Sequence, residues 1–79
     1  MNSGLGLSFS AALIHLIAGA KIQRTGWNGP GQFVAMQRPD ENSKMSRPYA
    51  YLVSSPDSVV PWVPSQGDLF SHDWVLVTN

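Results

Sequence analysis

The sequence contains no cysteine, so neither a disulfide nor a thiolate metal site can reinforce its fold. Charged residues make up 13% of the chain, against about 25% in ordinary soluble domains. A monomer with so few charges has a weakly protected surface, and association with further copies would hide part of it. We therefore expect a homo-oligomer.

Sequence motifs of catalysis and of phosphate binding are missing as well. The chain has no G-x-G-x-x-G and no P-loop, and Gly29-Pro30-Gly31 is too short and stiff to cradle a phosphate. His15 and His72 are too far apart to form a spaced pair of metal ligands. No Ser–His–Asp set has a recognisable signature, and a thiol nucleophile is absent. We therefore expect no enzyme activity, no catalytic residues, no metal and no cofactor.

Asp68 and Asp73 are a candidate pair of carboxylates for catalysis. They lie five residues apart across an expected bend, and this spacing does not define the geometry of acid–base chemistry. In the alternative interpretation, Asp68 caps a local turn and Asp73 accepts hydrogen bonds from neighbouring backbone amides.

Long hydrophobic runs are also missing. The apolar stretch Phe9–Ala20 holds about 12 residues, too few to span a bilayer. Met1–Ser8 has no Lys or Arg, so the positive region of a signal peptide is absent. We therefore expect a cytoplasmic protein without membrane partners.

The net charge is zero, but the charges are unevenly distributed. All five basic residues precede Pro48, so the first 48 residues carry +3 and the remainder carries −3. This imbalance is too weak for binding duplex nucleic acid, which needs a dense basic face. It is sufficient for meeting a diphosphate or a few phosphates in a small pocket.

The chain of 79 residues is expected to form a single domain over residues 1–79. Apolar residues recur at helical spacing from Phe9 onward, with Ser8 as the N-cap and Gly19 as the terminating residue. His15 falls outside the main apolar stripe and is expected at the surface or at an interface. Strand patterns occupy Lys21–Arg24, Gln32–Gln37, Pro48–Ser54, Val59–Val63 and Asp73–Thr78.

The connections between these strands are rich in turn formers. Asn28-Gly29 is a hairpin signal, and Pro61 restricts the fourth strand to an edge or a bulge. The polar segment Arg38–Arg47 is expected to be a mobile loop with a functional role. Pro64–His72 is irregular and has room for one helical turn. The sequence thus predicts an α+β fold, in which one N-terminal helix packs on a four- to five-stranded antiparallel sheet whose other face or edge can pair with another subunit.

Each of the three tryptophans stands beside a Gly, a Pro or an Asp, and therefore near a turn or the end of an element. A Trp in that setting offers a flat apolar face with polar groups nearby, which suits the stacking of a base. It also suits a core packed under loops, and both interpretations stay open. The candidate residues are Trp27, Tyr49, Tyr51 and Trp62 for stacking, Asn28, Ser65, Gln66 and Asp68 for polar edges, and Lys21, Arg24 and Arg47 for phosphates.

Four sequence motifs occur in an order that resembles a known family. They are Phe9-Ser10-Ala11-Ala12-Leu13, Gly19-Ala20-Lys21, Arg24-Thr25-Gly26-Trp27-Asn28-Gly29, and Pro61-Trp62-Val63-Pro64-Ser65-Gln66-Gly67-Asp68 with Asp73-Trp74. Together they cover nearly the whole chain and resemble the small phage and bacterial family that includes the second type of Thoeris anti-defence protein. This resemblance implies a helix packed on an antiparallel sheet, and a homotetramer with ligand pockets between subunits.

The resemblance also implies a phage-encoded sponge. Such proteins bind the cyclic ADP-ribose signal of the bacterial Thoeris system, here expected to be glycocyclic ADP-ribose, and sequester it without degrading it. Some relatives also sequester cyclic oligonucleotides of the CBASS system. In this interpretation Trp27 or Trp62 stacks on the adenine, and Arg24 and Arg47 face the diphosphate. The ribose and base edges would be bound by Asn28, Ser65, Gln66 and Asp68, with Tyr49 as a further aromatic wall.

Two alternatives remain at the level of sequence. Exposed aromatic side chains and a sheet edge would also suit a protein-interaction module that blocks a host protein. A hydrolase of the same signal is the other alternative. The motifs do not define which cyclic nucleotide is bound.

Overall fold

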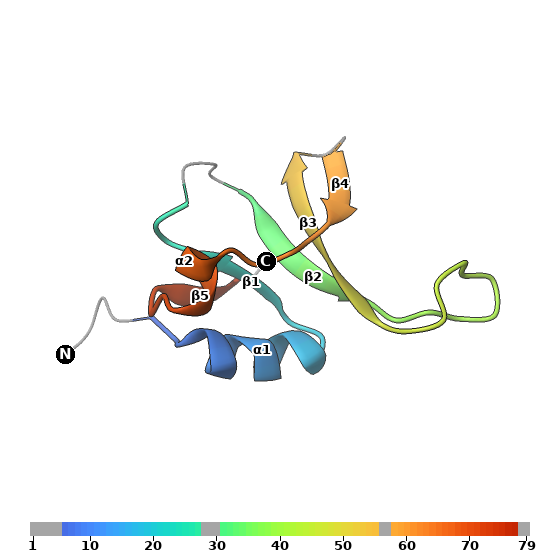
Figure 1. Ribbon diagram of the computed structural model, residues 1–79, viewed down its shortest axis with the longest axis horizontal. Helices are drawn as coiled ribbons and strands as arrows, with labels where there is room; N and C mark the ends of the chain where they lie inside the picture. Colours follow the sequence, from blue (N-terminus) through green and yellow to red (C-terminus); the bar gives the residue numbers. More distant parts are fainter. Residues whose placement is uncertain (1–5, 28–30, 56–57, 78–79) are drawn as a thin grey trace.

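The computed structural model describes residues 6–27, 31–55 and 58–77 (Figure 1). In chain order the elements are α1 (Phe9–Ile17), β1 (Lys21–Arg24), β2 (Phe33–Gln37), β3 (Tyr49–Ser55), β4 (Ser58–Pro61), α2 (Gln66–Leu69) and β5 (Trp74–Val77). The fold is α+β, with an N-terminal helix and a five-stranded antiparallel sheet, as the sequence predicts.

Helix α1 begins and ends at the residues that its capping signals indicate. The Ser8 side chain accepts a hydrogen bond from the backbone N–H of Ala11, at 3.3 Å, and so satisfies one of the free amides of the first turn. The helix stops because Gly19 takes a φ of 109°, which a residue with a Cβ adopts only at a cost. The backbone N–H of Ala20 then donates to the carbonyl of His15 and closes the last turn.

The first four strands form a meander of antiparallel neighbours, and β5 lies antiparallel to β1 at the opposite edge. The order across the sheet is therefore β4-β3-β2-β1-β5. Strand β4 is an edge strand that ends at Pro61, in agreement with the restriction that proline imposes. The remaining strand predictions are confirmed to within one residue at each described end.

One face of the sheet packs against α1. Its alternating positions include Ile22, which lies opposite Val34, and Val34 in turn lies opposite Leu52. The fully buried residues of this layer are Ala12, Leu16, Ile22, Val34 and Trp74. The opposite face carries Phe33, Tyr51 and Val53, and neither described helix packs on it. One sheet face is therefore open, as expected from a single covering helix.

The chain crosses from β4 at one edge to β5 at the other through residues 62–73, on the same side of the sheet as α1 (Figure 1). Trp62 fixes the start of this crossing, because its backbone N–H donates to the carbonyl of Ala50 at 3.0 Å. The helical turn expected between Pro64 and His72 is α2. The hairpin signal at Asn28-Gly29 and the end of the last expected strand at Thr78 lie outside the described residues.

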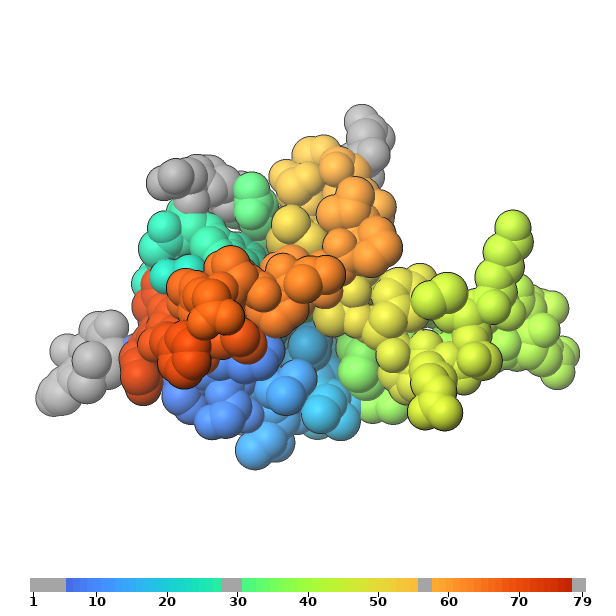
Figure 2. Space-filling model, viewed as in Figure 1, coloured from blue at the N-terminus to red at the C-terminus, as the bar shows by residue number. Residues whose placement is uncertain are grey.

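The polar segment between β2 and β3 projects from the body of the molecule (Figure 2). We call residues 38–48 the arm. At its base the Arg38 guanidinium donates to the carbonyl of Ile17 at the C-terminus of α1, where a cation is favourable. At its tip Asp40 accepts from the amide of Asn42 at 2.9 Å and the hydroxyl of Ser43 at 3.1 Å. No helix among the described residues is long and apolar enough to cross a membrane.

Candidate functional site

Three tryptophans from distant parts of the sequence meet beside α2. We call Trp27, Trp62 and Trp74, together with Phe9 of α1, the indole cluster. Trp74 is fully buried at its centre, and the rings of Trp27 and Trp62 meet it edge-on, with centroid distances of 5.4 and 5.9 Å. Phe9 lies 6.0 Å from Trp62 and 5.5 Å from Trp74. These tilted contacts are the arrangement that aromatic quadrupoles favour.

The indole cluster shows which tryptophan is a core residue and which two keep an exposed face. Trp74 is a core residue, and its indole N–H donates to the backbone carbonyl of Asp68 at 3.0 Å. Trp27 and Trp62 pack against the core but keep part of their surface exposed. They therefore contribute to folding and still keep apolar area exposed at the surface.

Arg24, at the end of β1, lies between two carboxylates of the C-terminal motif, those of Asp68 and Asp73. Its Nε donates to Asp73 Oδ1 at 2.8 Å, and its Nη1 donates to Asp68 Oδ1 at 2.9 Å. We call Arg24, Asp68 and Asp73 the clamp. The indole N–H of Trp27 donates to the same Asp68 oxygen at 3.3 Å. The clamp thus joins the indole cluster to α2 and to the start of β5.

The clamp keeps its members ionised. Burial acts to raise the pKa of Asp73, but hydrogen bonds from Arg24, Ser71 and the Gly26 amide outweigh it and lower that pKa to about 2. For Asp68, burial is likewise opposed and outweighed by hydrogen bonds from Ser65 and Arg24, so its pKa is lowered. Hydrogen bonds to Asp73 and Asp68 raise the pKa of Arg24. The carboxylates hold protons too weakly to act as acids near neutral pH.

Helix α2 is fixed by a reciprocal capping box. The Ser65 hydroxyl accepts from the Asp68 amide at 3.1 Å, and the Asp68 carboxylate accepts from the Ser65 amide at 3.0 Å. Asp68 is only 8% exposed. Gln66, the first residue of α2, is exposed and has its side chain available to a ligand.

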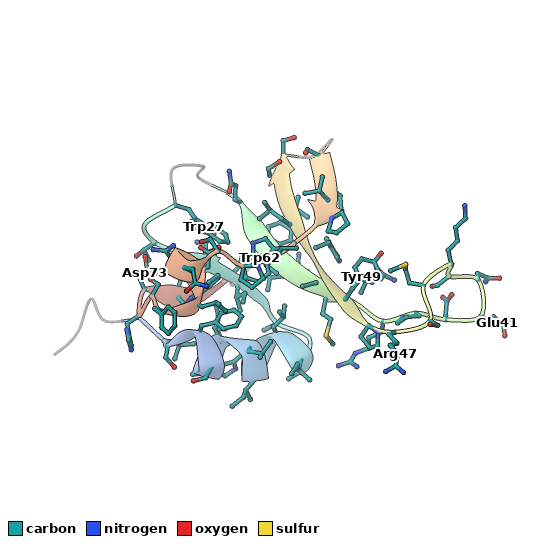
Figure 3. All side chains as sticks on the ribbon, viewed as in Figure 1. Trp27, Glu41, Arg47, Tyr49, Trp62 and Asp73 are labelled. Atoms are coloured by element: carbon teal, nitrogen blue, oxygen red, sulfur yellow. The ribbon has the colours of Figure 1, made fainter. Side chains whose placement is uncertain are left out.

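Two of the predicted site residues lie elsewhere. Arg47 is exposed on the arm, and Tyr49 begins β3 at the base of the arm (Figure 3). Tyr49 lines a depression of about 330 Å³. The lining residues are Gln37, Tyr49, Tyr51, Val59, Val60 and Pro61. This depression lies over β2, β3 and β4 and is separate from the indole cluster.

The structure thus brings together Arg24, Trp27, Trp62, Ser65, Gln66 and Asp68 around α2. Arg47 and Tyr49 are not part of that group, and Asn28 lies outside the described residues. The pairing of Arg24 with two carboxylates was not predicted, because the partners are 44 and 49 residues away in sequence. For Asp68, the alternative of a cap is confirmed, whereas Asp73 accepts from the backbone amide of Gly26, 47 residues away, and not from amides next to it in sequence.

The chemistry available at this site is that of binding. Half-buried indole faces, an exposed amide and a set of fixed hydrogen-bonding groups converge beside α2. Among residues 6–27, 31–55 and 58–77, no three His, Asp or Glu side chains are placed to hold a metal ion. The carboxylates of the clamp are occupied by Arg24 and by amide donors.

Comparison with known proteins identifies the family of this chain. A relative from Bacillus phage SP01, named Thoeris anti-defense 2, is 27% identical over 85 residues, and the match covers 91% of this chain and 96% of the relative. The sequence model of the Tad2-like family, described as the Thoeris anti-defense 2-like domain, matches residues 7–77. The match includes both motifs that form the clamp and the indole cluster. The chain therefore belongs to the Thoeris anti-defense 2-like family.

Proposed function

We propose that this protein is a phage anti-defence sponge that binds and sequesters a cyclic nucleotide-type immune signal without degrading it. The first expected ligand is glycocyclic ADP-ribose of the Thoeris system, and cyclic oligonucleotides of CBASS are the second. It would act in the cytoplasm of the infected bacterium. The observation that supports the proposal is the pair of half-exposed indoles, Trp27 and Trp62, beside the polar groups of α2.

The affinity that a sponge needs is difficult to reach with a pocket in a single chain. A sponge must hold the free signal below its receptor's threshold, and a nanomolar dissociation constant corresponds to about −12 kcal/mol. Stacking of one or two bases supplies roughly 1–3 kcal/mol each. The remainder must come from charge-assisted bonds to phosphates and from enclosure. We therefore propose a homotetramer whose ligand pockets lie between subunits, with the open sheet face as one surface available for association.

The site residues then take distinct roles. Trp27 or Trp62 stacks on the adenine, and Gln66 with the Ser65 hydroxyl binds ribose or base edges. Arg24 is already held by Asp68 and Asp73, so we assign it to ordering the site and not to the diphosphate. We assign phosphate binding to Arg47 in place of Arg24, and Tyr49 would form a further aromatic wall of the pocket.

Titration calorimetry of the purified protein with glycocyclic ADP-ribose, and with cyclic di- and trinucleotides, tests this proposal. We expect one of these ligands to bind with submicromolar affinity, and heating of the complex to return it intact by mass spectrometry. Gln66→Ala is expected to weaken binding, whereas His15→Ala, at an exposed position on α1, is the matched control. The absence of heat with every ligand, from a folded oligomer, would reject the proposal, and recovery of a cleaved ligand would indicate a hydrolase.

One observation favours a second candidate function. Val63 is 84% exposed and Phe70 is 75% exposed, on either side of α2. Exposed apolar side chains of this size also suit a module that binds and blocks a host protein. A pull-down that recovers a stoichiometric host protein, with no small molecule in the denatured extract, would favour this candidate.

A further inference from the structure

The surface around α2 lacks the positive charge that an anionic ligand needs. We call α2 with its flanking residues 62–73 and the clamp the α2 end. Its one guanidinium, that of Arg24, is bound by the carboxylates of Asp68 and Asp73. Two carboxylates and one guanidinium leave one net negative charge. A diphosphate that stacked against Trp27 or Trp62 would therefore need cations from another source.

The available cations are on the arm. Elsewhere in the described chain, the ammonium group of Lys21 lies 4.8 Å from the ring centroid of Phe33, and the Arg38 guanidinium is bound to the carbonyl of Ile17. Lys44 and Arg47 are exposed and form no salt bridge within the residues that the structure describes. With Asp40 and Glu41, the arm carries a net charge of +1. Its charge is thus complementary to that of the α2 end.

In one chain, the arm and the α2 end lie at opposite ends of a molecule whose longest dimension is 45 Å (Figure 3). Glu41 is at one end and Trp27 and Asp73 are towards the other, whereas Arg47 lies at the base of the arm, between Glu41 and Tyr49 in this view. The arm is fixed at its base by the Arg38 bond to α1 and closed at its tip around Asp40. It therefore does not fold back onto the α2 end of its own chain.

Apolar groups accompany the charges on both surfaces. Met45, which is 54% exposed, lies between Lys44 and Arg47 on the arm. The α2 end exposes Val63 and Phe70. A flexible thioether beside an aromatic ring is a favourable contact, and it would remove three large apolar side chains from water.

We propose that the arm of one copy docks on the α2 end of a second copy, with Met45 against Val63 and Phe70, and that Lys44 and Arg47 supply the positive charge of the second copy's ligand site. A two-fold arrangement makes this contact reciprocal, so that one interface builds two identical sites. The role of Lys44 and Arg47 in a ligand site rests on the proposed function, whereas the docking of the arm on the α2 end does not.

Thiol cross-linking tests the docking, because the chain has no native cysteine. Met45→Cys and Phe70→Cys variants, purified separately and then mixed, are treated with a short bismaleimide. We expect covalent dimers in the mixture, and far fewer with either variant alone, because like positions are not adjacent in the proposed pair. A mixture that yields no more covalent dimer than the single variants would overturn the docking.

Mixed oligomers test the shared site. One variant carries Lys44→Ala and Arg47→Ala, and the other carries Phe70→Asp; each is expected to lose binding of glycocyclic ADP-ribose. The two variants are co-expressed with different tags and purified together. In such a mixed oligomer, the intact arm of the Phe70→Asp chain docks on the intact α2 end of the chain that carries Lys44→Ala and Arg47→Ala. We expect up to about half of the wild-type binding capacity to return, because one of the two reciprocal sites is complete.

The outcomes separate this inference from the proposed function. If Arg47 served the Tyr49 depression within its own chain, the Lys44→Ala and Arg47→Ala variant would lose binding but Phe70→Asp alone would keep it, which would overturn the shared site. If the wild-type protein bound none of the tested nucleotides, the proposed function would fail. The cross-linking result would then still decide the docking.

Discussion

Arg24 and Asp73 are joined by a hydrogen bond of 2.8 Å between Nε and Oδ1, which ties the end of β1 to the residue before β5. The same carboxylate accepts from the Gly26 amide at 2.8 Å. A Cβ at Gly26 would lie 2.8 Å from Asp73 Oδ2, so a larger residue there would displace this carboxylate from its present position. The Arg-x-Gly-Trp motif is therefore a structural partner of the C-terminal Asp-Trp motif, and the proposed ligand surface is built on that pairing.

Replacing Asp73 with Asn is expected to destabilise the protein. The change keeps the volume but removes the charge that binds Arg24, and it leaves a partly buried guanidinium with one carboxylate. Hydrogen bonds to charged groups contribute about 1.5–3 kcal/mol each, so we expect a loss of about 1–3 kcal/mol in the free energy of unfolding. Urea denaturation followed by tryptophan fluorescence measures this loss.

Glu41→Gln is the matched control for that substitution. It also neutralises one carboxylate, but Glu41 is exposed on the arm and makes no salt bridge within the described part of the chain. Its effect is expected to stay within about 0.5 kcal/mol. Equal losses for the two variants would show that the clamp does not stabilise the fold.

The clamp also makes stability depend on pH. The pKa of Asp73 falls from its ordinary 3.8 to about 2 in the folded protein, and the pKa of Asp68 is lowered as well. A depressed carboxyl pKa stabilises the fold above the unfolded value, and that stabilisation is lost as the pH falls towards the folded value. We expect the urea midpoint to drop between about pH 4 and pH 2, and to drop less in Asp73→Asn. A midpoint with the same pH profile in both proteins would contradict this assignment.

Most of the architecture could be predicted from local signals. Ser8 and Gly19 bound α1 because capping chemistry acts within one helical turn, and alternating apolar residues mark the strands. The fourth strand was predicted to run to Val63, but it ends at Pro61. There the chain leaves the sheet: the Trp62 N–H still donates to Ala50 of β3, but the Trp62 ring turns towards Phe9 and Trp74.

The candidate site was predicted only in part. The contacts that were not predicted join residues that are far apart in the sequence. Sequence motifs named Arg24, Trp27 and Asp68 as site residues, but they could not show that Arg24 and Trp27 both donate to Asp68. Such pairing depends on β5 returning beside β1, which no local pattern encodes. The separation of Arg47 from the indole cluster was missed for the same reason, since distance along the chain does not define distance in space.

Gly19 allows a test of backbone conformation alone. It has a φ of 109°, and no other atom lies within 4 Å of the place that a Cβ would occupy. Gly19→Ala is therefore expected to cost about 1 kcal/mol through strain at the end of α1 and not through a clash. Gly19→Asn, which tolerates positive φ better, should cost less. Thermal unfolding of the two variants checks the order, and equal losses would contradict the assigned role.

Trp62 distinguishes a folding role from a binding role. Trp62→Ala removes a half-buried ring from contact with Phe9 and Trp74, and we expect a loss of about 2–4 kcal/mol in the free energy of unfolding. Trp62→Phe keeps an aromatic ring on the core and should cost less than about 1.5 kcal/mol. The phenyl ring nevertheless offers a smaller face to a base, so calorimetry with glycocyclic ADP-ribose should show weaker binding in a folded Trp62→Phe oligomer. Wild-type affinity in that variant would mean that Trp62 acts only in the core and that Trp27 alone carries the stacking.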